Sequence, residues 1–170
     1  MTKAISKKSP AQKTTKYQRP SFKIMVLASL GAFLAGSVLG IFNNLYLHPL
    51  VMGSFGASIF LVMAVPDNPF SQPRHVIGGH FLASLIGLFF LHVIGEMWWS
   101  MALALALSVL MMLVLKVPHP PAASNPIAIF LVSPDWLFLL APTFLGSVII
   151  VFIALLFNNL VRRGVYPQYW

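Results

Sequence analysis

The chain has 170 residues, of which 58% are apolar and only 8% charged, and its formal net charge is +8. Soluble domains carry roughly 25% charged residues, so this composition excludes a water-soluble surface, and its apolar content excludes a disordered chain. The absence of cysteine excludes a disulfide framework, a thiolate metal site and a cysteine nucleophile. We therefore predict a single integral membrane domain.

The first 21 residues form a basic tail without any acidic residue, and an apolar run follows directly. This order is typical of a cytoplasmic flank that lies on anionic lipid, and we expect no nucleic-acid partner. A cleaved signal peptide is not expected, because the basic region and the apolar run are both too long. An organelle transit peptide, which has a similar composition, is the alternative to a plain tail in a bacterial inner (plasma) membrane. The basic residues of the tail are Lys3, Lys7, Lys8, Lys13, Lys16 and Arg19.

Four long apolar runs predict membrane-spanning helices, because each approaches or exceeds the roughly 20 residues that cross a bilayer. They cover residues 22–47, 76–94, 97–115 and 136–161. Two shorter runs, 53–65 and 127–132, follow proline-marked stretches. Extended chain covers about 3.1 Å per residue, so an extended stretch over 118–125 followed by a short helix can cross. A re-entrant loop is the alternative.

The charges favour six crossings over four spans with two re-entrant loops. With a cytoplasmic tail, six crossings place all the basic residues inside, including Arg74 and Lys116, in agreement with the positive-inside rule. Re-entrant loops would place those two residues outside. Six crossings also put both chain termini in the cytoplasm. We predict a basic tail over 1–21, a transmembrane domain over 22–162 and a short C-terminal tail over 163–170.

A faint internal repeat supports two halves of three segments. His48-Pro49 precedes an Ile-Phe-Leu-Val string and Pro66-Asp67, and His119-Pro120 precedes the same string and Pro134-Asp135. Three crossings per half would invert the second copy, and inverted halves with interrupted middle segments are typical of transporters and channels. We therefore predict an all-α polytopic bundle with four long spans, two short interrupted segments and a 3+3 inverted repeat. Chance similarity between apolar strings is the alternative.

Small and aromatic residues indicate how the helices pack. Small residues recur every fourth position in two spans, and such stripes let helix backbones approach closely in lipid. Aromatic residues at the predicted span ends fit an interfacial belt. The stripes are Ala28, Ala32, Gly36 and Gly40, and Gly79, Ala83 and Gly87; the belt is Trp98, Trp99, Trp136, Tyr166, Tyr169 and Trp170.

No catalytic or metal-binding set is apparent. The acidic residues Asp67, Glu96 and Asp135 all fall in predicted loops, and Ser124 near His119 has neither a glycine elbow nor a nearby acid. Histidine spacing gives only a weak metal signal. We predict neither an enzyme nor a bound cofactor.

The polar residues at the segment junctions are the candidate transport pathway. In the six-crossing arrangement both short helices begin inside the membrane, where their N-terminal N–H groups favour an anion. Each residue also has a structural reading: Arg74 anchors a loop at lipid headgroups, His80 bonds a neighbouring helix, and His119 caps the break. The Asn125-Pro126 pair resembles an N-cap followed by a first-turn proline. The candidate residues are Ser54, Ser58, Arg74, His80, His119, Ser124 and Asn125.

These junctions resemble the HPP family of integral membrane proteins. The resemblance rests on Gly53–Ser58, on the Gln72-Pro73-Arg74 string that leads to Gly78-Gly79-His80, and on His119-Pro120-Pro121 with the residues to Pro126. Ala123 stands where the family commonly has glycine. The resemblance implies four transmembrane helices and, from members implicated in nitrite transport, a transporter or channel for a small monovalent anion such as nitrite.

Two other functions stay open: a channel for a small neutral solute, and a structural or assembly protein without flux. Because a unit of this size is small for a transporter, we also expect a homo-oligomer.

Overall fold

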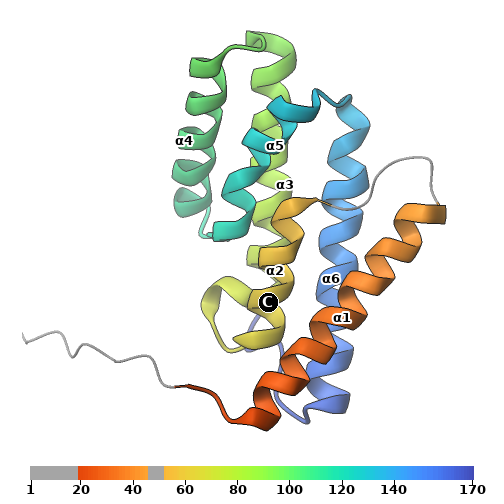
Figure 1. Cartoon of the computed structure of the whole chain (residues 1–170). Coiled ribbons are helices and arrows are strands. Elements are labelled where there is room, and N and C mark those ends of the chain that lie inside the picture. The colour runs from red at the N-terminus through yellow and green to blue at the C-terminus, as the bar shows by residue number, and fades with distance from the viewer. Residues whose placement is uncertain (1–18, 46–51) are drawn as a thin grey trace, which may run out of the picture.

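The computed structural model describes residues 19–45 and 52–170, and these residues form an all-helical bundle without strands (Figure 1). This confirms the predicted all-α class. The α-helices are α1 (Phe22–Leu45), α2 (Gly53–Ala64), α3 (Pro73–Phe89), α4 (Trp98–Val114), α5 (Asn125–Val132) and α6 (Leu145–Leu156). Short 3₁₀ turns cover Pro69–Ser71, Pro120–Ser124 and Trp136–Leu139, and π turns cover Phe90–Ile94, Leu140–Phe144 and Phe157–Val161.

Among the described residues, three helical stretches are long and apolar enough to cross a membrane, namely Phe22–Asn44, Pro73–Ile94 and Trp136–Val161. The remaining predicted long span forms α4, which has 17 residues. The last stretch is also interrupted, because Ala141 has the extended dihedral angles φ −137° and ψ 120°. Four long uniform spans therefore stay a prediction.

The second short segment runs along the whole of α3. At one end of α3, Nδ1 of His75 lies 3.0 Å from the carbonyl oxygen of Pro118. At the other end, Nε2 of His92 lies 2.9 Å from the carbonyl oxygen of Pro134. Residues 118–134 therefore leave the bundle at the end opposite to the one where they begin, as the crossing alternative predicts. The expectation of a fully extended stretch over 118–125 is wrong, because Pro120–Ser124 form a 3₁₀ turn.

The two short helices begin near the middle of α3 and run in opposite directions (Figure 1). Ser58 in the second turn of α2 and Asn125 at the start of α5 both bond to His80. The far end of α2 is held beside the start of α3, where Ser71 donates to the carbonyls of Leu61 and Val65. The predicted orientation of the two N-termini is therefore present. The inverted repeat stays a prediction, since residues 46–51, with His48, lie outside the described residues.

Basic side chains gather at one end of the bundle, which we call the basic end. Arg74 starts α3 there, and Lys116 precedes Val117 and Pro118, which lie against that end of α3. Arg162 donates to the carbonyl of Met63 at the end of α2, and a shallow pocket joins Lys23 to Arg162. Glu96 and Asp135 lie at the opposite end, next to the bond between His92 and Pro134. This distribution matches the expectation from the positive-inside rule.

The small-residue stripe of α3 is a close-packing face. A Cβ on Gly79 would lie 2.6 Å from Cβ of His119, and one on Gly87 would lie 3.0 Å from Cα of Pro126. Ala83, between them, is fully buried. The absence of side-chain bulk on this stripe is what allows residues 117–129 to lie against α3.

The predicted stripe of α1 is different, because Gly36 and Gly40 face open space within 4 Å. The close approach is made instead by Gly31, where a Cβ would lie 2.6 Å from Sδ of Met63 and 2.9 Å from Phe157. Helix α1 therefore packs on α2 and α6 through a neighbouring face. The predicted packing role of Gly36 has no partner among the described residues of this chain.

The exposure of five of the six aromatic residues fits the predicted belt, and the sixth is buried. Trp98, Trp99, Trp136, Tyr169 and Trp170 are exposed. Tyr166 is only 3% exposed, and its hydroxyl donates to the carbonyl of Ser71 at 2.8 Å. The C-terminal tail therefore folds back under the bundle rather than lying in an interface.

Candidate functional site

A serine bridges two buried histidines in the middle of the bundle. The Ser58 Oγ lies 2.7 Å from Nε2 of His80 and 2.8 Å from Nε2 of His119. All three side chains are fully buried, and the two imidazole rings meet edge to face at 5.0 Å. We call this cluster the His–Ser–His bridge.

Three different elements supply the bridge. Ser58 lies one turn after Ser54 on α2, and its Oγ also lies 3.1 Å from the Ser54 carbonyl. His80 projects from the middle of α3, while His119 has extended dihedral angles just before the Pro120–Ser124 turn. The histidine rings come together because Gly79 lets the backbone at His119 approach α3 closely.

Asn125 extends the bridge along α3. Its Nδ2 lies 3.0 Å from Nδ1 of His80 and donates to Oγ of Ser84 at 2.9 Å. The expected N-cap role of Asn125 is wrong: α5 begins at this residue, and its N-cap, Ser124, makes no side-chain cap bond. The amide bonds to α3 instead, where buried acceptors require a donor.

The chain of hydrogen bonds ends at the interruption of the last helical stretch. The Thr143 Oγ lies 3.0 Å from Oγ of Ser84 and 3.7 Å from Sδ of Met52. Thr143 follows the non-helical Ala141. Ser84 and Thr143 were missed from sequence, although Ser84 lies one turn after His80 and Pro142 marks the interruption. The side chains linked in this way are called the buried polar network: His119, Ser58, His80, Asn125, Ser84 and Thr143.

The protons of this network can be assigned. The Phe70 carbonyl lies 2.8 Å from Nδ1 of His119, so that nitrogen carries the proton and Nε2 of a neutral His119 accepts from Ser58. Ser58 then accepts from Nε2–H of His80. This leaves Nδ1 of His80 to accept from the amide of Asn125. Both bonds between Ser58 and the rings are therefore satisfied with neutral histidines, and the Ser54 carbonyl, 3.1 Å from Oγ of Ser58, is an alternative acceptor for the same hydroxyl proton.

Within residues 19–45 and 52–170, two buried polar atoms have no hydrogen-bond partner: Oγ of Ser54 and Oδ1 of Asn125. Unpartnered buried polar groups are uncommon in folded proteins, and each costs about 1–3 kcal/mol. One lies near the start of α2 and the other at the start of α5. They mark the starts of both short helices as positions where a small polar guest would gain hydrogen bonds.

The remaining candidate residues lie outside the network. Arg74 is exposed at the basic end. Ser124 is exposed too, and its hydroxyl donates to the carbonyl of Pro121 at 2.8 Å. The structure therefore brings together Ser58, His80, His119 and Asn125, with Ser54 one turn away, and leaves Arg74 and Ser124 apart.

The C-terminal tail closes the network towards the basic end. The Tyr169 hydroxyl lies 3.2 Å from Nε2 of His75, whose Nδ1 bonds to the Pro118 carbonyl next to His119. Gln168 adds two contacts, from its backbone N–H to the side chain of Gln72 and from its amide to Asp67. No sequence pattern predicted this closure.

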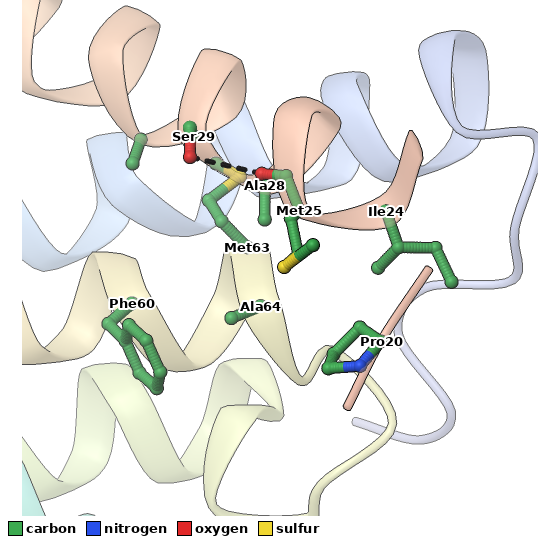
Figure 2. A pocket seen from close by; sticks show the side chains of 9 residues that line it. Pro20, Ile24, Met25, Ala28, Ser29, Phe60, Met63 and Ala64 are labelled. Atoms are coloured by element: carbon green, nitrogen blue, oxygen red, sulfur yellow. Dashed lines mark hydrogen bonds between the residues drawn. The ribbon is translucent and has the colours of Figure 1, made fainter. Parts of the chain in front are cut away.

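A separate groove of about 260 Å³ lies between α1 and α2 (Figure 2). Its lining is apolar apart from Ser29, whose hydroxyl is turned to the carbonyl of Met25 at 3.0 Å. The groove shares no residue with the polar network. It is lined by Pro20, Ile24, Met25, Ala28, Ser29, Ala32, Phe60, Met63 and Ala64.

The described residues contain no cluster of three or more His, Cys, Asp or Glu side chains that could hold a metal ion. The network also contains no carboxylate, because Asp67, Glu96 and Asp135 lie in the connections between helices.

Comparison with known proteins identifies the family. The family described as "HPP, transmembrane region" matches residues 17–167. The chain belongs to the HPP family. Two transmembrane proteins of Dictyostelium discoideum are similar to it, at 33% identity over 129 residues (71% of this chain, 45% of the relative) and at 28% over 128 residues (71% and 41%). This HPP chain therefore spans less than half the length of those relatives. No solved structure matches it.

Family membership and the apolar helices together establish an integral membrane protein. In this HPP chain, the buried polar network therefore lies within a helical membrane bundle. Polar residues at such positions are costly and usually functional.

Proposed function

We propose that this protein is a transporter or channel for a small monovalent anion, with nitrite as the first substrate to test. The observation that carries the proposal is the meeting of two helix N-termini at one buried polar network. Ser58 and Asn125 both reach His80, and α2 and α5 diverge from there to opposite ends of α3. Discontinuous helices with this arrangement form substrate sites in many transporters.

The chemistry of the network suits an anion better than a metal cation. An anion that enters a low-dielectric interior needs hydrogen-bond donors to replace its lost water. The start of α2 supplies backbone N–H groups, and the unpartnered Ser54 hydroxyl adds a donor. At the start of α5 the helix dipole remains, but the Asn125 N–H already bonds to the Ala122 carbonyl and Pro126 has no N–H. The network has no carboxylate to balance a metal ion. Nitrite as the specific anion rests on the family resemblance alone.

A channel for a small neutral solute is the second candidate. One atom favours it: the unpartnered Oδ1 of Asn125 can only accept a hydrogen bond. A bare anion has no proton to donate to this oxygen, whereas a neutral acid or alcohol can donate one. The bridge is also fully satisfied with neutral histidines, so no fixed positive charge is required there.

Reconstitution into liposomes tests both candidates. Vesicles with purified protein and protein-free vesicles receive pulses of nitrite, nitrate, chloride and formate, and separately of urea and glycerol. The proposal expects saturable uptake of at least one of the anions above the protein-free background. Uptake of uncharged solutes alone supports the second candidate, and no protein-dependent uptake contradicts both.

The proposal also places the protein in a bacterial inner membrane, with both termini in the cytoplasm and with copies associated as a homo-oligomer. Charge asymmetry between the two ends of the bundle supports this orientation. The open face at Gly36 and Gly40 supports association.

A further inference from the structure

We infer that the anion moves together with a proton, and that Asn125 is the switch that couples the two. This inference rests on the proposed function and specifies its energy source. It comes from one asymmetry: in the bridge with neutral histidines, the Asn125 amide offers both its protons to α3 and leaves its oxygen without a partner.

A proton added to the bridge changes what His80 can do. Nδ1 of His119 is held as a donor by the Phe70 carbonyl, so the extra proton makes His119 donate from both nitrogens or makes His80 do so. In the first case the Ser58 hydroxyl donates to the Ser54 carbonyl at 3.1 Å and accepts from both rings, so Nδ1 of His80 is unchanged. In the second case His80 carries protons on both nitrogens, and its Nδ1 becomes a donor. The switch therefore requires the proton on His80.

This new donor conflicts with the Asn125 amide. Two N–H groups would then face each other across the 3.0 Å between Nδ1 of His80 and Nδ2 of Asn125. A half-turn of the amide about its Cβ–Cγ bond removes the conflict, because Oδ1 then accepts from His80. Ser84 can donate to the same oxygen, since its hydroxyl proton is free to rotate.

The same half-turn reverses the polarity of the site. The NH₂ group of Asn125 now occupies the position where an unpartnered acceptor stood, and the bridge carries one positive charge. Both changes favour an anion. Without the proton, that position presents an oxygen that repels an anion. Proton uptake and anion binding therefore support each other, as linkage requires.

The resting state is also defined by the structure. The backbone carbonyl of His80 lies 3.3 Å from Nδ2 of Asn125, and it would face Oδ1 after the turn. This carbonyl opposes the turned state, so the amide returns when the proton leaves. The switch is thus biased towards the neutral, anion-free arrangement.

Other ionisable groups on the surrounding elements do not take up this proton in place of the bridge histidines. Helices α2, α4, α5 and α6 contain no Asp, Glu, Lys, Arg or His. Helix α3 adds the exposed Arg74 and also His75, which bonds to the Pro118 carbonyl and to Tyr169. Lys116 and Asp67 lie outside the network at the basic end. The two bridge histidines are therefore the proton acceptors within the network.

The test measures protons and anions together. Proteoliposomes with an internal pH dye receive an inward nitrite gradient without a pH gradient, with and without a potassium–valinomycin voltage clamp. We expect internal acidification above the protein-free background, with one proton per nitrite and with no need for valinomycin. Nitrous acid can cross lipid without the protein and produce a background acidification. Nitrate is the matched control anion, because its acid is too strong to cross lipid by itself.

Two variants assign the coupling to the bridge. His80→Gln retains hydrogen-bonding groups but cannot take up a proton, and it should lose the coupled acidification. Ser124→Ala, next to Asn125 but outside the network, should retain the wild-type ratio. Nitrite uptake that needs valinomycin and carries no proton would overturn the inference and leave the proposed function intact. Absence of any anion uptake would overturn both.

Discussion

The hydroxyl of Tyr169 lies 3.2 Å from Nε2 of His75, so the next-to-last residue of the chain closes the basic end of the central helix. Three residues earlier, Tyr166 makes a second, buried bond to the Ser71 carbonyl. The tail is therefore part of the folded bundle. Loss of the hydroxyl should affect stability differently at its two tyrosines.

We expect Tyr166→Phe to destabilise the protein more than Tyr169→Phe. Tyr166 is buried, so loss of its hydroxyl leaves the Ser71 carbonyl without this partner and costs about 1–3 kcal/mol. Tyr169 is 42% exposed, and water replaces its bond at a cost of about 1 kcal/mol or less. Thermal unfolding in detergent measures both. Equal effects would contradict the buried role of Tyr166.

Alkaline pH should release the tail. Burial raises the pKa of Tyr166 above its ordinary value, which is about 10. The folded protein therefore holds this proton where the unfolded chain has lost it, and stability falls as the pH rises above about 10. Ultraviolet absorbance of tyrosinate and thermal unfolding between pH 8 and 12 measure this. Tyr166→Phe should flatten the fall, and an unchanged profile would contradict the assignment.

Substitutions on the two small-residue stripes should separate folding from assembly. Ala83→Leu inserts bulk between α3 and the segment that follows α4, and should cost about 1–3 kcal/mol. Gly36→Leu meets open space, so the single chain should remain folded. Size-exclusion chromatography with light scattering then reports whether Gly36 packs against a second copy. If the wild type is monomeric and the Gly36→Leu protein nevertheless misfolds, the described packing of α1 is contradicted.

Cysteine labelling tests the crossing of residues 118–134, because the chain has no native cysteine. Single cysteines at Arg74 and Lys116 should react with an impermeant reagent from one side of the membrane. Single cysteines at Glu96 and Asp135 should react from the other side. Labelling of positions 116 and 135 from the same side would restore the re-entrant alternative.

Salt dependence should distinguish Arg74 from Asn125. Arg74 is exposed, so we expect it to act by raising the local anion concentration, an effect that salt screens. Arg74→Gln should lower anion uptake mainly at low ionic strength. Asn125→Leu should lower uptake at all salt concentrations, because Asn125 is fully buried in the network. Wild-type uptake by both variants would remove these residues from the pathway.

The long apolar runs, the breaks between them and the opposed short helices were predictable from sequence, because each depends on local composition. The convergence of Ser58, His80 and His119 was expected only as a pathway. Its bonding depends on the close approach that Gly79 permits. A stripe of small residues predicts that some backbone comes near, but not which residue arrives.

Three features could not be read from the chain. Asn125 followed by proline has the pattern of an N-cap, and only the buried acceptors of α3 divert its amide. Tyr166 is an aromatic residue near a predicted span end, which is typical of an interfacial residue, and only the fold of the tail buries it. Ser84 and Thr143 are ordinary small polar residues within apolar runs, and their role depends on contacts between segments 59 residues apart.

The close approach at Gly31 also bears on the order of assembly during synthesis. Gly31 contacts Met63, which is made soon afterwards, and Phe157, which is made more than a hundred residues later. Domains fold progressively as the chain emerges, with N-terminal parts first. Helix α1 can therefore settle on α2 early, but its other neighbour exists only after α2 to α5 have been made. Helix α1 thus enters the membrane before those helices and reaches its final position after them.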